Sequence, residues 1–506
     1  MAITRRAAVL AATITFGGVL VTPAPSQGVA SSLHSAPRAA AHSAQSTLHW
    51  SRCKSFELRV SGARCATLRV PLNYGHPHQR MITLALARVK HSARPYKGVM
   101  LTNPGGPGGA GRYLATLGES VPHNVGAHYD WIGIDPRGTG ASKPRVSCGD
   151  HGYFGFHRPN YNATHKTAFA KWVRRTKKYD AACAKHNGRI LNHLTTKDSA
   201  RDMDSIRKAL GVRRISYYGY SYGTYLGQVY ATLFPGRIKR MVLDSNVDPR
   251  RVWYGANLDQ DGAFQHNSQV WFRWIAHHAG RYHLGPTEKK VQQRWYRIRA
   301  RLTGHADHGI GPDEWTDVFL DAEYYRFTWA EQAVLFANYA HHHDYSGVRT
   351  KYRDANSGDG GSFAMYNAVQ CTDNQWPRSW QRWLRDNSRI AKKAPFMTWQ
   401  NFWFNAPCKY WPAAAHKPVH ITGAAVPRTL LVDQTKDAAT PYSGSLEVRR
   451  LFSNSRLIAL PGGTSHADSL SGNSCLDDRI AAYLNKGRLP ARKSGNRADA
   501  TCRPRP

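Results

Sequence analysis

The stretch Tyr217–Tyr225, which reads YYGYSYGTY, places one serine midway between two glycines. It follows the strand-like run Arg214–Tyr218 and precedes a run that favours a helix. At a strand-to-helix turn of this kind the serine hydroxyl is exposed at the top of a sheet, and the turn is so tight that the residues two before and two after it must be small. Gly219 and Gly223 meet that requirement. The stretch therefore predicts a nucleophile elbow at Ser221, with a chance glycine-rich turn as the alternative.

Other strand-like runs lead into glycine-rich turns in the same way. Lys97–Leu101 leads into Asn103–Gly109, and Asp130–Ile134 leads into Asp135–Gly140. Strands that alternate with helices are typical of a parallel sheet covered by helices. The sequence therefore predicts an α/β fold with a mostly parallel central sheet. Three more apolar runs extend the predicted sheet: Lys239–Leu243, Thr429–Val432 and Arg456–Leu460.

The pattern changes between Ser245 and Trp411, where long helical stretches are crowded with tryptophan. We expect a helical cap at 246–410, inserted between two parts of an α/β core at 47–245 and 411–506. The tryptophans of the cap favour a packed core, although an apolar wall for a substrate is the alternative. They include Trp271, Trp274, Trp295, Trp315, Trp329, Trp380, Trp383, Trp399 and Trp403.

The first residues have the features of a secretory signal. Two arginines precede the apolar run Ala7–Val21, and small residues follow it. The run is shorter than the ~20 residues that a membrane span needs. We predict a signal peptide at 1–30, a disordered linker at 31–46 and a secreted, extracellular protein without a transmembrane segment.

The chain carries 70 basic and 33 acidic residues, which gives a formal net charge of +37. Such a surface attracts anionic polymers. Because the basic residues are dispersed and match no nucleic-acid-binding motif, we expect no specific nucleic acid partner. Electrostatic association with an anionic cell envelope and simple solubility remain as two interpretations of the charge.

Eight cysteines in an exported chain favour disulfides over metal or redox chemistry. None has the C-x-x-C spacing of a zinc site. Pairing in sequential order is the simplest connectivity, although the sequence alone does not prove it. The sequential pairs are Cys53 with Cys65, Cys148 with Cys183, Cys371 with Cys408, and Cys475 with Cys502.

A serine hydroxyl is a weak nucleophile unless a histidine takes its proton and a carboxylate orients that histidine. In this kind of fold the three follow in the order serine, acid, histidine. His466 stands just after the last predicted strand, and two acids, Asp433 and Asp437, follow the strand before it. Asp433 abuts its strand, whereas Asp437 has the reach of a loop residue, so we favour Asp437.

The oxyanion of an attacked carbonyl needs two N–H donors. One comes from the residue after the nucleophile, here Tyr222, and the other from the loop after an early strand. Asn103–Gly108 is the natural source of the second, because glycines let the backbone approach a substrate closely.

Taken together, these motifs resemble the secreted tripeptidyl aminopeptidase-like branch of the α/β-hydrolases, which is related to the prolyl aminopeptidases. The matching stretches are Asn103–Gly109 (NPGGPGG), Asp135–Ser142 (DPRGTGAS), Gly219–Gly227 (GYSYGTYLG) and a C-terminal module from about Cys408 to Cys502. The resemblance implies an α/β-hydrolase fold. The proposed serine chemistry needs no cofactor. The residue roles that it implies are Ser221 as nucleophile, Asp437 as acid, His466 as base, and Gly106 with Tyr222 as oxyanion donors.

An enzyme that removes residues from a free amino terminus needs a carboxylate near the pocket to pair with the ammonium group. We single out Asp373, because it lies two residues from Cys371 and would be held in place if that cysteine bridges Cys408. Each acid of the cap is also a candidate for a surface or helix-capping role. The cap acids include Asp248, Asp259, Asp261, Asp321, Glu323 and Asp373.

The leading hypothesis is a secreted serine exopeptidase that removes di- or tripeptides from the free N-termini of peptide substrates. No metal is expected, since the adjacent histidines of His341–Asp344 (HHHD) would point in different directions on a helix. Two alternatives remain: a secreted esterase or amidase of the same fold, and a non-catalytic envelope-binding protein.

Overall fold

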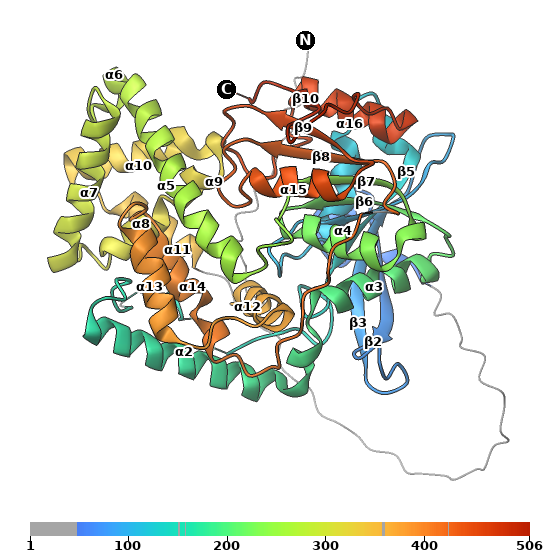
Figure 1. Cartoon of the computed structure of the whole chain (residues 1–506), viewed down its shortest axis with the longest axis horizontal. Helices are drawn as coiled ribbons and strands as arrows, with labels where there is room; N and C mark the ends of the chain where they lie inside the picture. The colour runs from blue at the N-terminus through green and yellow to red at the C-terminus, as the bar shows by residue number, and fades with distance from the viewer. Residues whose placement is uncertain (1–47, 150–151, 157, 357–359, 424, 506) are drawn as a thin grey trace, which may run out of the picture.

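The structure, a computed structural model, describes residues 48–149, 152–156, 158–356, 360–423 and 425–505. The predicted signal peptide and linker lie outside these residues. Figure 1 shows a central sheet on one side of the molecule and a group of helices on the other.

The sheet has ten strands in the order β1-β2-β3-β5-β4-β6-β7-β8-β9-β10. Neighbouring strands are parallel from β5 through β10, whereas β1, β2 and β3 pair antiparallel with their neighbours. The predicted α/β class with a mostly parallel sheet is therefore confirmed. The strands are β1 (Ser51–Arg52), β2 (Arg64–Pro71), β3 (Met81–Val89), β4 (Gly98–Asn103), β5 (Tyr129–Asp135), β6 (Ile215–Tyr220), β7 (Ile238–Asp244), β8 (Thr429–Gln434), β9 (Arg456–Leu460) and β10 (Ala500–Thr501).

The central strands read as continuous apolar runs because helices cover both faces of the sheet. Leu243 and Leu431 belong to the core on one face, and their neighbours Val242 and Leu430 belong to the core on the other. The helices of the α/β part are α1 (Phe56–Val60), η1 (Arg112–Ser120), η2 (Val125–His128), α2 (Lys166–Asn187), η3 (Gly188–His193), α3 (Thr196–Ala209), α4 (Tyr222–Leu233), η4 (Pro235–Arg237), α15 (Ser443–Leu451) and α16 (Ser474–Lys486).

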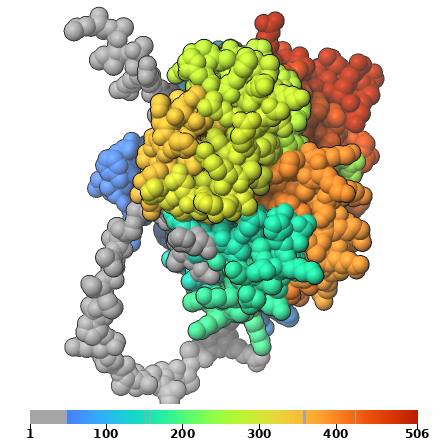
Figure 2. All heavy atoms as spheres, turned by 90° about the vertical axis from the view of Figure 1, so that its left-hand side faces the viewer, coloured from blue at the N-terminus to red at the C-terminus, as the bar shows by residue number. Residues whose placement is uncertain are grey.

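The remaining helices lie between β7 and β8 in the chain and form the large helical insertion. Figure 2, which faces this side of the molecule, shows the insertion packed above the helix α2 in one continuous surface. Its elements are α5 (Tyr254–His277), α6 (Ala279–Tyr282), α7 (Glu288–Gly304), α8 (Pro312–Val318), α9 (Leu320–Tyr324), η5 (Arg326–Thr328), α10 (Trp329–His342), α11 (Ser346–Ala355), α12 (Gly361–Asp373), α13 (Trp380–Ala391), α14 (Thr398–Asn405) and η6 (Ala406–Lys409).

The tryptophans of the insertion mostly form its core. Trp271, Trp295 and Trp315 are completely buried in one aromatic cluster, and Trp403 is completely buried against the α/β part. An apolar core of this kind holds the insertion together as a rigid wall beside the sheet.

Four disulfides join the eight cysteines in sequential order: Cys53–Cys65, Cys148–Cys183, Cys371–Cys408 and Cys475–Cys502. The third ties the end of α12 to η6 and so links two elements of the insertion. Across the described ranges, no helix is long and apolar enough to cross a membrane.

Candidate active site

Ser221 occupies the tight turn between β6 and α4. Its backbone has φ 55° and ψ −127°, a region that non-glycine residues rarely adopt. A Cβ atom on Gly219 would lie 2.5 Å from the carbonyl oxygen of Gly223, and one on Gly223 would lie 2.8 Å from that of Asn103. Glycine at both positions is therefore what permits the turn that lifts Ser221 to the end of the sheet.

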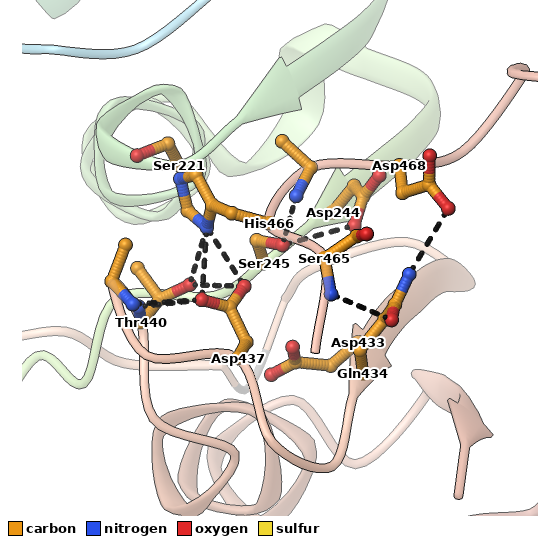
Figure 3. Close-up of polar contacts among 12 residues, drawn as sticks. Ser221, Asp244, Ser245, Asp433, Gln434, Asp437, Thr440, Ser465, His466 and Asp468 are labelled. Atoms are coloured by element: carbon orange, nitrogen blue, oxygen red, sulfur yellow. Dashed lines mark hydrogen bonds and ion pairs between the residues drawn. The ribbon is translucent and has the colours of Figure 1, made fainter. Parts of the chain in front are cut away.

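His466 lies in the loop after β9, at the same end of the sheet. Its Nδ1 is 2.8 Å and 3.0 Å from the two carboxylate oxygens of Asp437, and its ring is buried. The other ring nitrogen lies towards Ser221 (Figure 3). The backbone N–H of His466 donates to the carbonyl of Tyr324 in the insertion, so both parts of the chain position the ring.

Of the two acids that the sequence left open, the structure brings Asp437 to the histidine. The Asp437 carboxylate also accepts hydrogen bonds from the N–H groups of Ala439 and Thr440 and from the Thr440 hydroxyl, at 2.9–3.0 Å. These donors fix the orientation of the carboxylate, so that both of its oxygens face the Nδ1 of His466.

Asp433 points elsewhere. It is fully buried and accepts a 2.5 Å hydrogen bond from the Ser445 hydroxyl, while its other oxygen has no partner among the described residues. Burial, together with the nearby Asp437 charge, raises the pKa of Asp433 well above its ordinary value. Asp433 is therefore a buried core residue whose surroundings favour the neutral form of its carboxyl group.

The charges around His466 set its proton affinity. Burial lowers the pKa of the imidazole, but the charge and the hydrogen bond of Asp437 outweigh burial, and Asp244 adds to them. The pKa of His466 is therefore raised above its ordinary value, which suits a group that takes a proton from a serine.

A second pair of side chains holds the histidine loop, and the sequence reasoning missed it. Asp244, at the end of β7, accepts hydrogen bonds from the N–H (2.9 Å) and the hydroxyl (2.5 Å) of Ser469. The adjacent Ser245 hydroxyl accepts from the N–H of Ala467 at 2.8 Å. The sequence did indicate Asp244 as a candidate, because it directly follows an apolar strand-like run, just as Asp433 does.

The loop after β4 packs directly on the elbow. A Cβ atom on Gly105, whose φ is +100°, would lie 2.7 Å from the carbonyl oxygen of Tyr220 and 2.8 Å from the Ser221 Cβ. Both predicted oxyanion donors, Gly106 and Tyr222, line the same cavity as Ser221.

That cavity has a volume of about 380 Å³, and its walls come from the α/β part and from the insertion. Besides His466, the lining aromatic residues are Tyr222, Trp253, Tyr324, Tyr325, Tyr366 and Phe404. The lining amide side chains are Asn257, Gln260, Gln370, Gln400 and Asn401. The tryptophans that the sequence singled out do not line it, because they are used in the core of the insertion.

The structure does not place Asp373 in this cavity. Its carboxylate is buried behind the wall, where it accepts hydrogen bonds from the N–H (2.7 Å) and hydroxyl (2.5 Å) of Thr196 and from the Trp253 indole (3.2 Å). The disulfide does hold Asp373, but it holds it at the start of α3. The expectation that Asp373 faces a substrate is therefore corrected.

Two other acids of the insertion region do line the cavity, Asp248 and Asp259. Each is paired with an arginine, Asp248 with Arg250 at 2.6 Å and Asp259 with Arg251 at 2.7 Å. The remaining candidates, Asp261, Asp321 and Glu323, are absent from the described residues of the lining.

Comparison with known proteins gives a consistent group of relatives. Residues 394–502 match the family model described as TAP-like protein. A tripeptidyl aminopeptidase of Streptomyces lividans is 39% identical over 482 residues, which cover 92% of this chain and 88% of the relative. Serine protease Hip1 of Mycobacterium tuberculosis is 29% identical, with 88% and 89% covered, and carboxylesterase B of the same organism is 29% identical, with 87% and 88% covered.

Proposed function

We propose, from the premise that the chain belongs to the tripeptidyl aminopeptidase family of serine α/β-hydrolases, that it releases di- or tripeptides from the free amino termini of extracellular polypeptides. The observation that carries the proposal is that His466, whose ring contacts the Asp437 carboxylate, lines the same cavity as Ser221.

In the proposed reaction, the Ser221 hydroxyl attacks the carbonyl carbon of the scissile peptide bond while His466 takes the hydroxyl proton. The N–H groups of Tyr222 and Gly106 stabilise the oxyanion that forms. His466 then gives the proton to the leaving nitrogen, and the C–N bond breaks to leave an acyl-enzyme on Ser221. A water molecule, deprotonated by His466, attacks the acyl carbon. The ester C–O bond to Ser221 then breaks, His466 returns the proton to the Ser221 oxygen, and the short peptide leaves. Asp437 keeps the imidazole in one orientation and stabilises its charged form.

Recognition of the substrate ammonium group falls to the acids that line the cavity. Asp248 and Asp259 are the two carboxylates of the described lining, and each is held by an arginine on one side. Asp248, whose side chain is 12% exposed, lies deeper than the half-exposed Asp259, and a charge-assisted hydrogen bond from the substrate amine to Asp248 would favour a free terminus over a blocked one.

Secretion is supported by the cysteine chemistry. Four disulfides persist in an oxidising compartment and not in the cytosol of a mesophile. Association of the +37 chain with an anionic envelope is a separate expectation, checked by binding that weakens as salt is raised.

The test of the proposed function compares free and N-acetylated forms of the same peptide library, with products identified by mass spectrometry. We expect that only the free peptides lose a fixed number of amino-terminal residues, and that the Ser221→Ala variant cuts neither form. Equal cleavage of the acetylated peptides would exclude recognition of the amine. No cleavage of any peptide would exclude the peptidase.

An esterase is the second candidate, favoured by the 29% identity to a carboxylesterase. It predicts turnover of short acyl esters that exceeds turnover of every free-amine peptide. The same Ser221→Ala variant separates either activity from a contaminant, because both depend on the serine.

A further inference from the structure

A second hollow, of about 830 Å³, lies beside the catalytic cavity and is lined with arginines. We call it the arginine groove. Its six arginines are Arg250, Arg251, Arg378, Arg382, Arg385 and Arg389. Asp386 is the single acid in its described lining, and Arg250 and Arg251 pair with aspartates outside it, so the net positive charge of the groove comes from the other four arginines.

The spacing of the arginines shows that one wall is a helix face. Arg382, Arg385 and Arg389 are three and four residues apart on α13, which places them on one side of that helix. All three are solvent-exposed. The opposite wall is the segment before α5 and the first turn of that helix, where Tyr254 lies under the Arg382 guanidinium at 5.7 Å.

The positive charge of this α13 wall is only partly neutralised within the protein. Asp386 is shared, at 3.6 Å from Arg382 and 3.4 Å from Arg385. Arg378 donates to the side-chain oxygen of Gln375, which is uncharged. This wall, α13 with Arg378 just before it, therefore holds four arginines and one carboxylate, which contacts only Arg382 and Arg385 among them. Guanidinium groups that are not fully neutralised bind carboxylates and phosphates well.

Arg251 connects the groove with the catalytic cavity, because it lines both. Its side chain is 44% exposed, which places the Arg251–Asp259 ion pair at the rim of the cavity rather than in its depth. An exopeptidase keeps only the first residues of its substrate in the cavity, so the rest of the chain must leave over such a rim. A chain that leaves past Arg251 enters the groove.

We infer that the arginine groove binds acidic side chains of the polypeptide substrate, downstream of the scissile bond. The inference rests on the proposed exopeptidase function, and it makes acidic polypeptides the favoured substrate class. Continuity with the cavity through Arg251 favours a substrate segment over an independent anionic polymer.

The test uses two peptides that share their amino-terminal residues and end in a run of either glutamate or glutamine. For the unmodified protein at low salt, we expect kcat/KM for the glutamate peptide to be about tenfold higher than for the glutamine peptide. Each exposed ion pair contributes little to binding, but several of them together give a preference of this size. The preference should shrink as salt is raised. In the triple variant R382A/R385A/R389A the preference should disappear, while kcat/KM for the glutamine peptide stays unchanged.

A charge-matched control is the triple variant K289A/K290A/R297A on α7, whose exposed basic residues do not line the groove. It should keep the preference for glutamate. The conservative variant R382K/R385K/R389K retains the positive charge and should also keep most of the preference for glutamate. Circular dichroism of each variant shows that the fold is retained.

Equal kcat/KM for the two peptides in the unmodified protein would overturn this inference and leave the proposed function standing. Equal loss of preference in the α7 control would also overturn it, because general charge would then be the cause. Cleavage of neither peptide would overturn the proposed function and the inference with it. Competition by polyphosphate that depends on the α13 arginines, without any preference for glutamate peptides, would assign the groove to a phosphate polymer instead.

Discussion

Asp244 accepts two hydrogen bonds from Ser469, three residues beyond His466, and so ties the histidine loop to the end of β7. The negative charge of Asp244 also raises the pKa of His466. One carboxylate thus affects both the position and the proton affinity of a ring that it does not touch.

We predict that Asp244→Asn lowers kcat by about tenfold and moves the acid limb of the pH profile to lower pH. The base must be neutral to take the serine proton, so activity falls as the pH drops through the pKa of His466. Because Asp244 raises that pKa, its removal lowers it. A pH profile of kcat/KM checks the direction, and an unshifted acid limb would show that Asp244 only holds the loop.

Replacement of the two acids after β8 separates their roles. Asp437→Asn should lower kcat by about 10⁴-fold, because the imidazole loses its orienting charge. Asp433→Asn should change kcat by less than about threefold, because Asp433 bonds Ser445 rather than the imidazole and an amide oxygen can accept the same hydrogen bond. Steady-state kinetics on one peptide decides the matter, and a large loss in the Asp433 variant would contradict the assignment.

Gly105→Ala tests the close approach of the β4 loop to the elbow. The added Cβ would collide with Tyr220 and Ser221, so we expect the rate of labelling by a fluorophosphonate to fall by at least about 100-fold. Gly98→Ala is the matched control, since Gly98 also has a positive φ (+114°) but has open space around it. That control should lose roughly 1–3 kcal/mol of stability through backbone strain and keep its reactivity.

The Cys371–Cys408 disulfide joins α12 to η6, which directly follows α14, and both α12 and α14 carry residues that line the cavity. Replacement of both cysteines by serine should lower the free energy of unfolding by about 3–4 kcal/mol and raise KM. Serine at both Cys475 and Cys502, which are absent from the described lining, should cost similar stability and leave KM unchanged. Urea unfolding and peptide kinetics on both variants provide the comparison.

The sheet and the elbow were predictable from sequence because they depend on local rules. Apolar runs followed by glycine-rich turns marked the central strands, and the spacing of Gly219 and Gly223 around Ser221 marked the turn. The loop reach of Asp437 likewise favoured it over Asp433, and the structure brings Asp437 to the histidine.

The interior of the insertion was less predictable, because its contacts join residues far apart in the chain. Asp373 was chosen from its distance along the sequence to a cysteine, yet its partner Thr196 lies 177 residues away. The arginine groove was equally hard to predict, because its lining residues come from segments about 120 residues apart, 250–258 and 374–389. Only the packing of α13 beside the start of α5 brings its two walls together.

Both edges of the sheet end in the same way. β1 and β10 are strands of two residues, and each is followed at once by a cysteine in a disulfide, Cys53 and Cys502. Long unpaired edges invite strand addition by other molecules, and short edge strands discourage it. The Cys53–Cys65 and Cys475–Cys502 disulfides therefore help to hold the short edge strands β1 and β10 against the longer strands β2 and β9. We expect reduction of these two disulfides to lower the solubility of the protein before it alters the catalytic cavity.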